Sequence, residues 1–267
     1  MAKLDGDQGG GHWYTAEGKA MHKVPLASGQ GYRRTNITDA RKMGLIPSPT
    51  SILGVQAKPG LDKWAKEQVG ISAFTNPPVD GEDDKAYAKR MINLSYQQTS
   101  AAAEFGTEFH LLLENVLNGE PCPDDWKIHV DPILKWKADK SLQFVEREKI
   151  VLNLTEGYAG TMDVAARGGG GEKMVVDWKT RKTFKGYPVK AYEGQILQIA
   201  AYAAAYWGEG PVRNGEVYGV NAYISSTEAG RFERIGYTPE EIRRAYEVFL
   251  NLCAVWRWMK DYDPRRT

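Results

Sequence analysis

Four stretches of the chain have the pattern of strands. Residues 158–166 and 173–179 alternate apolar and polar side chains or are rich in β-branched residues, which is typical of strands. Four glycines lie between these two stretches and indicate a turn centred near Gly170. Residues 142–154 and 216–225 have the same character. We therefore predict four strands, of which the middle two form a hairpin.

Other stretches have the periodicity and the end signals of helices. Residues 61–70 predict a helix that ends at its last residue, a glycine, and residues 85–118 predict a helix in one or two pieces that Gly119 ends. Another helix is predicted over residues 190–207. A Thr-Pro-Glu-Glu sequence has threonine at the N-cap and proline at the first helical position, so it predicts the start of a last helix over residues 239–260.

The order of these elements predicts an α/β fold with a central mixed β-sheet flanked by helices. A mostly helical N-terminal region precedes the sheet, because residues 44–54 contain two prolines and predict a turn into a short helix. Residues 1–31 are rich in glycine and polar residues, and we expect them to be loosely packed or partly disordered. We divide the chain into an N-terminal extension and helical region, residues 1–84, which packs on a core of residues 85–267.

The composition narrows the classes of protein and site. The chain has 267 residues and 42% hydrophobic residues, enough for one large domain with or without a small addition. No apolar run approaches about 20 residues, and the first residues lack an apolar signal segment, so we expect no membrane partner and no secretion. Cys122 and Cys253 are too few for a four-thiolate zinc or iron–sulfur site. These features fit a reducing, cytoplasmic location.

The predicted hairpin brings two carboxylates together. A turn centred on Gly170 places Asp163 opposite Asp177, where side chains on one face lie about 5 Å apart and like charges destabilise the sheet. We therefore expect a cation between them. Lys179 lies two residues after Asp177 and shares its face. This group suits a hard divalent cation such as Mg²⁺ and an anionic substrate. The alternative is a solvated hairpin with an ordinary Lys–Asp ion pair.

One predicted helix offers a candidate metal ligand. Gly106, His110 and Glu114 are four residues apart and lie on one helix face. Gly106 allows this face to approach another backbone closely, and His110 can then ligate a metal beside the carboxylates. The alternative is a histidine with an ordinary structural role.

A later helix carries three polar groups on one face. Gln195, Gln198 and Tyr202 follow the spacing i, i+3, i+7 in a stretch otherwise rich in alanine and isoleucine. Buried amides need partners, which a phosphate backbone or metal-binding carboxylates would supply. The alternative is a helix at the edge of the core whose amides face solvent.

Nucleic-acid binding would require local positive charge, because the net charge of the chain is only +1. Basic residues that can neutralise phosphates follow the second strand of the hairpin directly. They are Arg181, Lys182, Lys185 and Lys190. Aromatic residues that can stack on single-stranded bases precede the hairpin. They are Trp64, Phe74, Tyr87 and Tyr96. The alternative is that the basic residues are ordinary solvated charges and that the aromatic residues pack in the core.

Four short motifs occur in a fixed order along the chain. They are GxxxH at 106–110, GxxD at 160–163, DxK at 177–179 and QxxxY at 198–202. In order and spacing they resemble the RecB-like branch of the PD-(D/E)XK nuclease superfamily, over about residues 103–206. Residues 46–68 are also similar to the N-terminal region of phage-type and mitochondrial exonucleases of this branch.

The resemblance implies a PD-(D/E)XK nuclease core that hydrolyses DNA phosphodiester bonds with Mg²⁺ or Mn²⁺. The implied metal ligands are His110, Asp163, Asp177 and the carbonyl of Trp178. The implied catalytic residues are Lys179, Asp177, Asp163, Gln198 and Tyr202, and the implied substrate-binding residues are Gln195, Arg181, Lys182, Lys185 and Lys190. Some relatives hold a four-cysteine iron–sulfur cluster, which this chain cannot form. The acidic residue that the family places one strand earlier is Glu146 or Glu148.

We therefore expect a metal-dependent exonuclease that acts on single- or double-stranded DNA ends. The resemblance points to phage or prophage recombination or replication in the cytoplasm of a bacterial host, with a single-strand annealing or binding protein as a further partner. One alternative is a structure-selective endonuclease of the same fold. Another is a nucleic-acid-binding module without catalytic activity, against which the intact aspartates and lysine argue.

Overall fold

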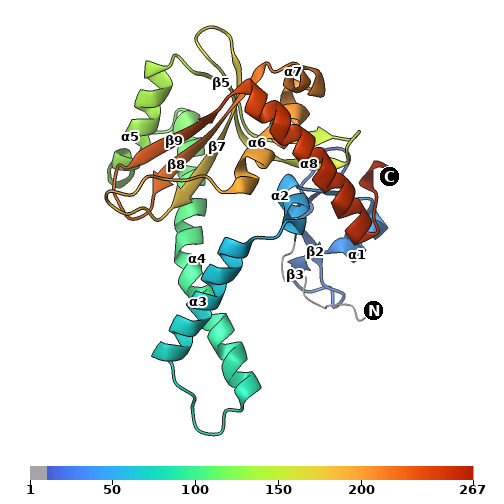
Figure 1. The fold of residues 1–267 in the computed structure, drawn as a ribbon, viewed down its shortest axis with the longest axis vertical. Coiled ribbons are helices and arrows are strands. Elements are labelled where there is room, and N and C mark those ends of the chain that lie inside the picture. The colour runs from blue at the N-terminus through green and yellow to red at the C-terminus, as the bar shows by residue number, and fades with distance from the viewer. Residues whose placement is uncertain (1–10, 267) are drawn as a thin grey trace.

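The computed structural model describes residues 11–266 and has an α/β fold built on a five-stranded mixed sheet (Figure 1). The strand order is β5-β6-β7-β8-β9, with β7 and β8 parallel and the other neighbours antiparallel. The strands are β5 Gln143–Asn153, β6 Tyr158–Arg167, β7 Lys173–Arg181, β8 Val217–Ser225 and β9 Phe232–Tyr237. The predicted α/β class with a mixed sheet flanked by helices is confirmed.

Helices cover both faces of this sheet (Figure 1). They are α4 Asp84–Leu117 and α5 Asp124–Asp139 on one face, and α6 Glu193–Trp207 and α8 Pro239–Lys260 on the other. Successive side chains of β7 point to opposite faces of the sheet and so contribute to two separate hydrophobic cores. Val175 packs with α6 and α8, while Val176 packs with α4 and α5. The strand that carries the predicted Asp and Lys is therefore buried on both faces.

The local end signals of the last helices are confirmed. Thr238 caps α8 in a capping box with Glu241, and the helix has the predicted bounds. The predicted helix over residues 190–207 begins three residues later, at Glu193, because Tyr192 is its N-cap. A short helix, α7 Glu209–Arg213, then leads into β8, and η2 Pro264–Arg266 follows α8.

Two elements of the core were not predicted. Helix α5 contains Pro132, which argues against a helix from the sequence alone. Its buried residues Val130, Ile133 and Trp136 pack beneath the sheet, and this tertiary burial stabilises the helix despite the proline. Strand β9 is a short edge strand that exists through its pairing with β8.

The N-terminal region is more ordered than predicted. Strands β1 Trp13–Tyr14 and β4 Ile46–Pro47 pair with each other, and Trp13 packs in the core of α6 and α8 with only 4% of its surface exposed. The expectation of loose packing is therefore wrong at Trp13 and Tyr14, two aromatic residues that lie among glycines and polar residues. Residues 1–10, on which the same expectation fell, lie outside the described residues. The remaining elements are β2 Lys23–Pro25, β3 Tyr32–Arg34, α1 Ile37–Met43, α2 Pro49–Ile52 and η1 Leu53–Val55. The predicted short helix within residues 44–54 is thereby confirmed, and it begins at Pro49.

Helices α3, Pro59–Thr75, and the first part of α4 form a hairpin that extends away from the sheet (Figure 1). The predicted end of α3 at Gly70 is wrong, because the helix continues to Thr75. A glycine in an exposed helix costs stability but does not end the helix. Helix α4 is one continuous helix of 34 residues. The domain boundary at residues 84 and 85 stays a prediction.

Within residues 11–266, no helix is long and apolar enough to cross a membrane.

Candidate metal centre

The β6–β7 hairpin opens where its two aspartates lie. Arg167 pairs with Lys173, so the turn is centred on Gly170, and the last pair of the ladder is Val164 with Val176. Asp163 and Asp177 are the next residues on each strand. Beyond the last pair, one oxygen of Asp163, Oδ2, accepts a hydrogen bond from the backbone N–H of Trp178 at 2.7 Å. The aspartates are neighbours as predicted, and the carboxylate of Asp163 bridges the gap between the strands.

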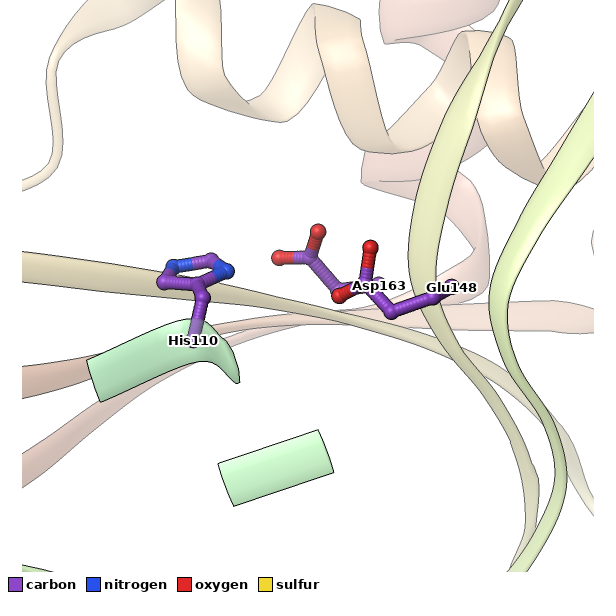
Figure 2. A group of neighbouring side chains, drawn as sticks. All are labelled: His110, Glu148 and Asp163. Atoms are coloured by element: carbon purple, nitrogen blue, oxygen red, sulfur yellow. The ribbon is translucent and has the colours of Figure 1, made fainter. Parts of the chain in front are cut away.

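Three side chains from three elements converge beside this opening (Figure 2). His110 comes from α4, Glu148 from β5 and Asp163 from β6, and their ligand atoms all lie within 4.8 Å of one another. Each of the three residues is partly buried. Two carboxylate oxygens and one imidazole nitrogen are a donor set that suits Mn²⁺ and that Mg²⁺ can share. We call these three residues the open trio.

Glu148 reaches the trio through an unusual backbone conformation. Arg147 and Lys149 pair with Val164 and Met162, so Glu148 occupies the register position of Asp163. Its φ angle is 43°, in the left-handed region that non-glycine residues rarely adopt. Such a conformation costs about 1–3 kcal/mol and is found where the surrounding structure enforces it, often at functional sites.

The structure distinguishes the two glutamates that the sequence left open. Glu148 belongs to the open trio, whereas Glu146 lies 3.3 Å from the ammonium group of Lys149 in an ion pair at the surface. A shift of register between Phe144 and Glu146 sets which residues of β5 oppose the aspartate. Glu148 is therefore the acidic residue that accompanies Asp163.

The electrostatics of the trio favour a bound cation. Burial, followed by the charges of Glu114 and Asp177, raises the pKa of Glu148 to about 7. Burial, followed by the charge of Asp177, raises the pKa of Asp163 well above its usual range. Burial, followed by the charge of Lys179, lowers the pKa of His110, which favours the neutral imidazole that ligates metals. A divalent cation would offset the cost of crowding these carboxylates.

Asp177 has a different environment and is only 1% exposed. The ammonium group of Lys179 donates to its Oδ1 at 2.8 Å, and the side-chain amide of Asn221 donates to its Oδ2 at 2.7 Å. Tyr237 in turn donates from its hydroxyl to Oδ1 of Asn221 at 2.8 Å. We call Asp177, Lys179 and Asn221 the closed network. The expected repulsion between the two aspartates is present, because the charge of Asp177 raises the pKa of Asp163, but Asp177 itself is paired with Lys179. The role of Asp177 as a metal ligand stays a prediction.

Lys179 keeps its charge in this setting. Burial by itself lowers the pKa of a lysine, but Asp177 and Asp163 more than offset this effect, so the pKa of Lys179 lies above its usual value. Its side chain is 28% exposed. A charged ammonium group is therefore held beside the trio and accessible to an anion.

The glycines of two motifs allow close packing around the site. A Cβ atom at Gly106 would lie 2.7 Å from Oγ1 of Thr180, so the glycine brings α4 against β7 one turn before His110. The close neighbour is this side chain rather than the backbone that we expected. A Cβ atom at Gly160 would lie 2.8 Å from the ring of Tyr202. Both glycines therefore set the distance between a helix and the sheet.

The polar residues of α6 make contacts within the protein. The amide of Gln198 donates to the hydroxyl of Tyr202 at 3.3 Å. The side-chain oxygen of Gln195 accepts from the backbone N–H of Tyr192 at 2.9 Å and from the hydroxyl of Tyr223 at 2.6 Å. Gln195 thus caps the helix, and the predicted substrate roles of this face stay predictions.

The predicted basic residues lie outside the trio, at the end of β7 and on the loop that follows it. Arg181 contacts Lys190 and Tyr192, while Lys182, Lys185 and Lys190 are exposed. The four aromatic residues proposed to stack on bases lie in the α3–α4 hairpin, far along the chain from this loop. Phe74 is 91% exposed, and the hydroxyl of Tyr87 donates to the carbonyl of Ala73 at 3.0 Å.

The sequence interpretation missed Asn221 and Tyr237. Asn221 is a fully buried polar residue in the middle of an apolar strand, and a buried amide in such a strand signals a specific partner. Its partner could not be identified, because Asn221 meets Asp177 only through the parallel pairing of β7 and β8. Cys122 and Cys253 are both free thiols.

No protein-family model and no curated protein matches this chain. Among solved structures, this chain is similar to the crystal structure of SSO0001, with 17% sequence identity and a TM-score of 0.30. The matched region covers 72% of this chain and 85% of the SSO0001 chain. A similarity this weak supports no conclusion about the fold family or the function.

Proposed function

We propose that this protein is a metal-dependent DNA nuclease with a PD-(D/E)XK core, and that it acts as an exonuclease at DNA ends. The observation that carries the proposal is the convergence of the open trio with a charged lysine at the open end of one hairpin. The residues that converge include His110, Asp163, Asp177 and Lys179, which are the residues of three of the four sequence motifs. The resemblance and the geometry thus support the same site.

The residues present fit a divalent cation. His110, Glu148 and Asp163 would hold Mg²⁺ or Mn²⁺, with Asp177 and the carbonyl of Trp178 as further proposed ligands. When bound, such an ion supplies a more acidic water molecule and polarises a phosphoryl oxygen. The crowded carboxylates and the neutral imidazole support this assignment.

The remaining residues would position and stabilise the substrate. The ammonium group of Lys179 would stabilise the negative charge that develops on the scissile phosphate. Asp177 orients that ammonium group and is itself held by Asn221. Gln198 and Tyr202 would support the adjacent wall of the site through their own hydrogen bond.

The proposal is tested with oligonucleotides labelled at either end, single- and double-stranded, incubated with Mg²⁺, Mn²⁺ or EDTA. We expect metal-dependent shortening from an end, with closed circular DNA left intact. Linearised circles would instead show an endonuclease. DNA binding without any product under all metal conditions would show a module that lacks catalysis. A partner that anneals or binds single strands, and a bacterial cytoplasmic setting, stay predictions.

A further inference from the structure

The loop of residues 182–192 connects two elements of the proposed site. It begins after β7, which carries Lys179, and it ends at α6, which carries Gln195 and Gln198. Arg181, the last residue of β7, shares the strand face of Lys179. Anything bound along this loop would therefore lie next to two elements that carry residues of the proposed site.

Arg231 holds the middle of this loop in place. Its guanidinium donates to the backbone carbonyls of Phe184 and Tyr187 and forms ion pairs with Glu228 and Glu233. The N–H of Tyr187 donates to the carbonyl of Phe184 at 3.0 Å, which closes a turn. The loop is thus fixed through its backbone.

The two ends of the loop are fixed in the same way. The N–H of Thr183 donates to Oγ1 of Thr227 at 3.0 Å, and the N–H of Val189 donates to a carboxylate oxygen of Glu233 at 3.1 Å. Arg181 donates to the carbonyl of Lys190 at 2.7 Å. Because backbone groups of the loop make these bonds, its aromatic and basic side chains are left exposed, whereas Thr183 is buried and Val189 and Ala191 are partly buried.

Those side chains alternate between aromatic and basic. Phe184, Tyr187 and Tyr192 are 67%, 72% and 66% exposed. An exposed lysine precedes each of them, namely Lys182, Lys185 and Lys190. Residues 179–192 contain no aspartate or glutamate, although the whole chain has a net charge of only +1. Large aromatic side chains on a fixed, purely basic loop match the chemistry of single-stranded nucleic-acid sites, where bases stack and cations contact phosphates.

We propose that this loop is a preformed stacking platform for single-stranded DNA, with Phe184 and Tyr187 as its base-stacking residues. The inference rests on the proposed nuclease function and specifies its substrate as a single strand. In a duplex the faces of internal bases are covered by their neighbours, so the two aromatic rings would have nothing to stack on. The lysines can contact phosphates of single-stranded and of duplex DNA alike. The aromatic rings therefore provide the preference for a single strand.

The test is equilibrium binding by fluorescence anisotropy, with Ca²⁺ in place of Mg²⁺ to prevent hydrolysis. The probes are a labelled oligo-dT of about 12 nucleotides, within the usual size of such sites, an abasic oligomer of the same length and a blunt duplex. We expect the wild type to bind oligo-dT about tenfold or more tightly than either other probe, the scale of losing one stacked base.

Variants locate that preference on the loop. Phe184→Ala/Tyr187→Ala should lose about tenfold or more in affinity for oligo-dT, whereas Phe184→Tyr/Tyr187→Phe should keep it because both rings remain. Trp258→Ala, which removes an aromatic residue that is 83% exposed on α8, is the matched control and should bind as the wild type does. Melting temperatures check that each variant is folded.

Equal binding of oligo-dT and the abasic oligomer would overturn the platform, as would tighter binding of the duplex or no effect of the double alanine variant. The proposed function is checked separately, by Mn²⁺-dependent hydrolysis of bis(p-nitrophenyl) phosphate by the wild type. This small ester has no base to stack. If the protein fails this assay but binds oligo-dT through Phe184 and Tyr187, the stacking platform is supported and the proposed nuclease function is overturned.

Discussion

The two halves of the candidate site use the same residue type in opposite ways. In the open trio, Asp163 faces His110 and Glu148, and the one side-chain hydrogen bond described for it comes from the backbone of Trp178. In the closed network, both oxygens of Asp177 accept hydrogen bonds from Lys179 and Asn221. Asp163 lies beside a second carboxylate and an imidazole, a group that a bound cation would stabilise. Asp177 is already paired with a cation, the ammonium group of Lys179.

This difference shows how a single hairpin can supply two functions. Asp163 has a raised pKa because burial and neighbouring carboxylates disfavour its charge. Asp177 is more deeply buried, with 1% of its surface exposed, but is paired with the ammonium group of Lys179 at hydrogen-bond distance. The open trio is suited to bind a metal ion, and the closed network is suited to hold the lysine. Variants that remove side chains of the open trio or of the closed network test whether the two groups have these separate functions.

The largest effect is expected from Asp163→Asn. It removes a proposed metal ligand, so DNA hydrolysis should fall by about 10³-fold or more. Mn²⁺ at about ten times its Kd should raise the melting temperature of the wild type by about 3–6 °C and leave that of the variant nearly unchanged. Without metal the variant should melt no lower than the wild type, because the asparagine oxygen can still accept the N–H of Trp178. An equal metal-induced shift in both proteins would place the ion elsewhere.

Lys179→Met should lower turnover by about 10²–10³-fold, the scale for losing one electrostatic stabiliser. It leaves the buried Asp177 without its cation, so the free energy of unfolding should fall by about 3–5 kcal/mol in urea titrations. The double variant Lys179→Met/Asp177→Asn removes both charges. It should recover most of that stability but none of the turnover. Turnover near that of the wild type in Lys179→Met would contradict the assignment of the lysine.

Glu148→Gln and Glu146→Gln form a matched pair on one strand. Glu148→Gln should weaken Mn²⁺ binding by about 10–100-fold in calorimetry, since it removes one carboxylate of the trio. Glu146→Gln should change the affinity by less than about twofold, because an exposed ion pair contributes little. Equal effects in the two variants would show that general negative charge, and not the trio, binds the ion.

The smallest effect on metal binding is expected from Asn221→Ala. It leaves one oxygen of the buried Asp177 without a donor, so the free energy of unfolding should fall by about 1–3 kcal/mol. The Mn²⁺-induced rise in melting temperature should stay close to that of the wild type, because the hydrogen bonds of the Asn221 side chain go to Asp177 and Tyr237 and not to the open trio. Tyr237→Phe, which removes the next hydrogen bond outward, serves as a milder comparison. Loss of the metal response in Asn221→Ala would show that the two halves of the site are coupled.

Features with local causes could be predicted from the sequence. The hairpin turn follows from consecutive glycines between two strands, and the start of α8 follows from the Thr-Pro-Glu-Glu cap. The proximity of Asp163 and Asp177 follows from the same turn by counting residues along two antiparallel strands. The sequence prediction was wrong at Gly70, which α3 passes through, and it left out α5, which contains Pro132.

By itself, then, the sequence determined the α/β class with a mixed sheet, the hairpin with its two aspartates and the residues of the four motifs. Only the tertiary structure decided that Glu148 and not Glu146 joins His110, because a register shift and a left-handed residue in β5 set which side chain opposes Asp163. The same holds for Asn221, which reaches Asp177 through the parallel pairing of two strands 44 residues apart in the chain. Contacts of this kind depend on the register between distant segments, and no local pattern of residues encodes that register.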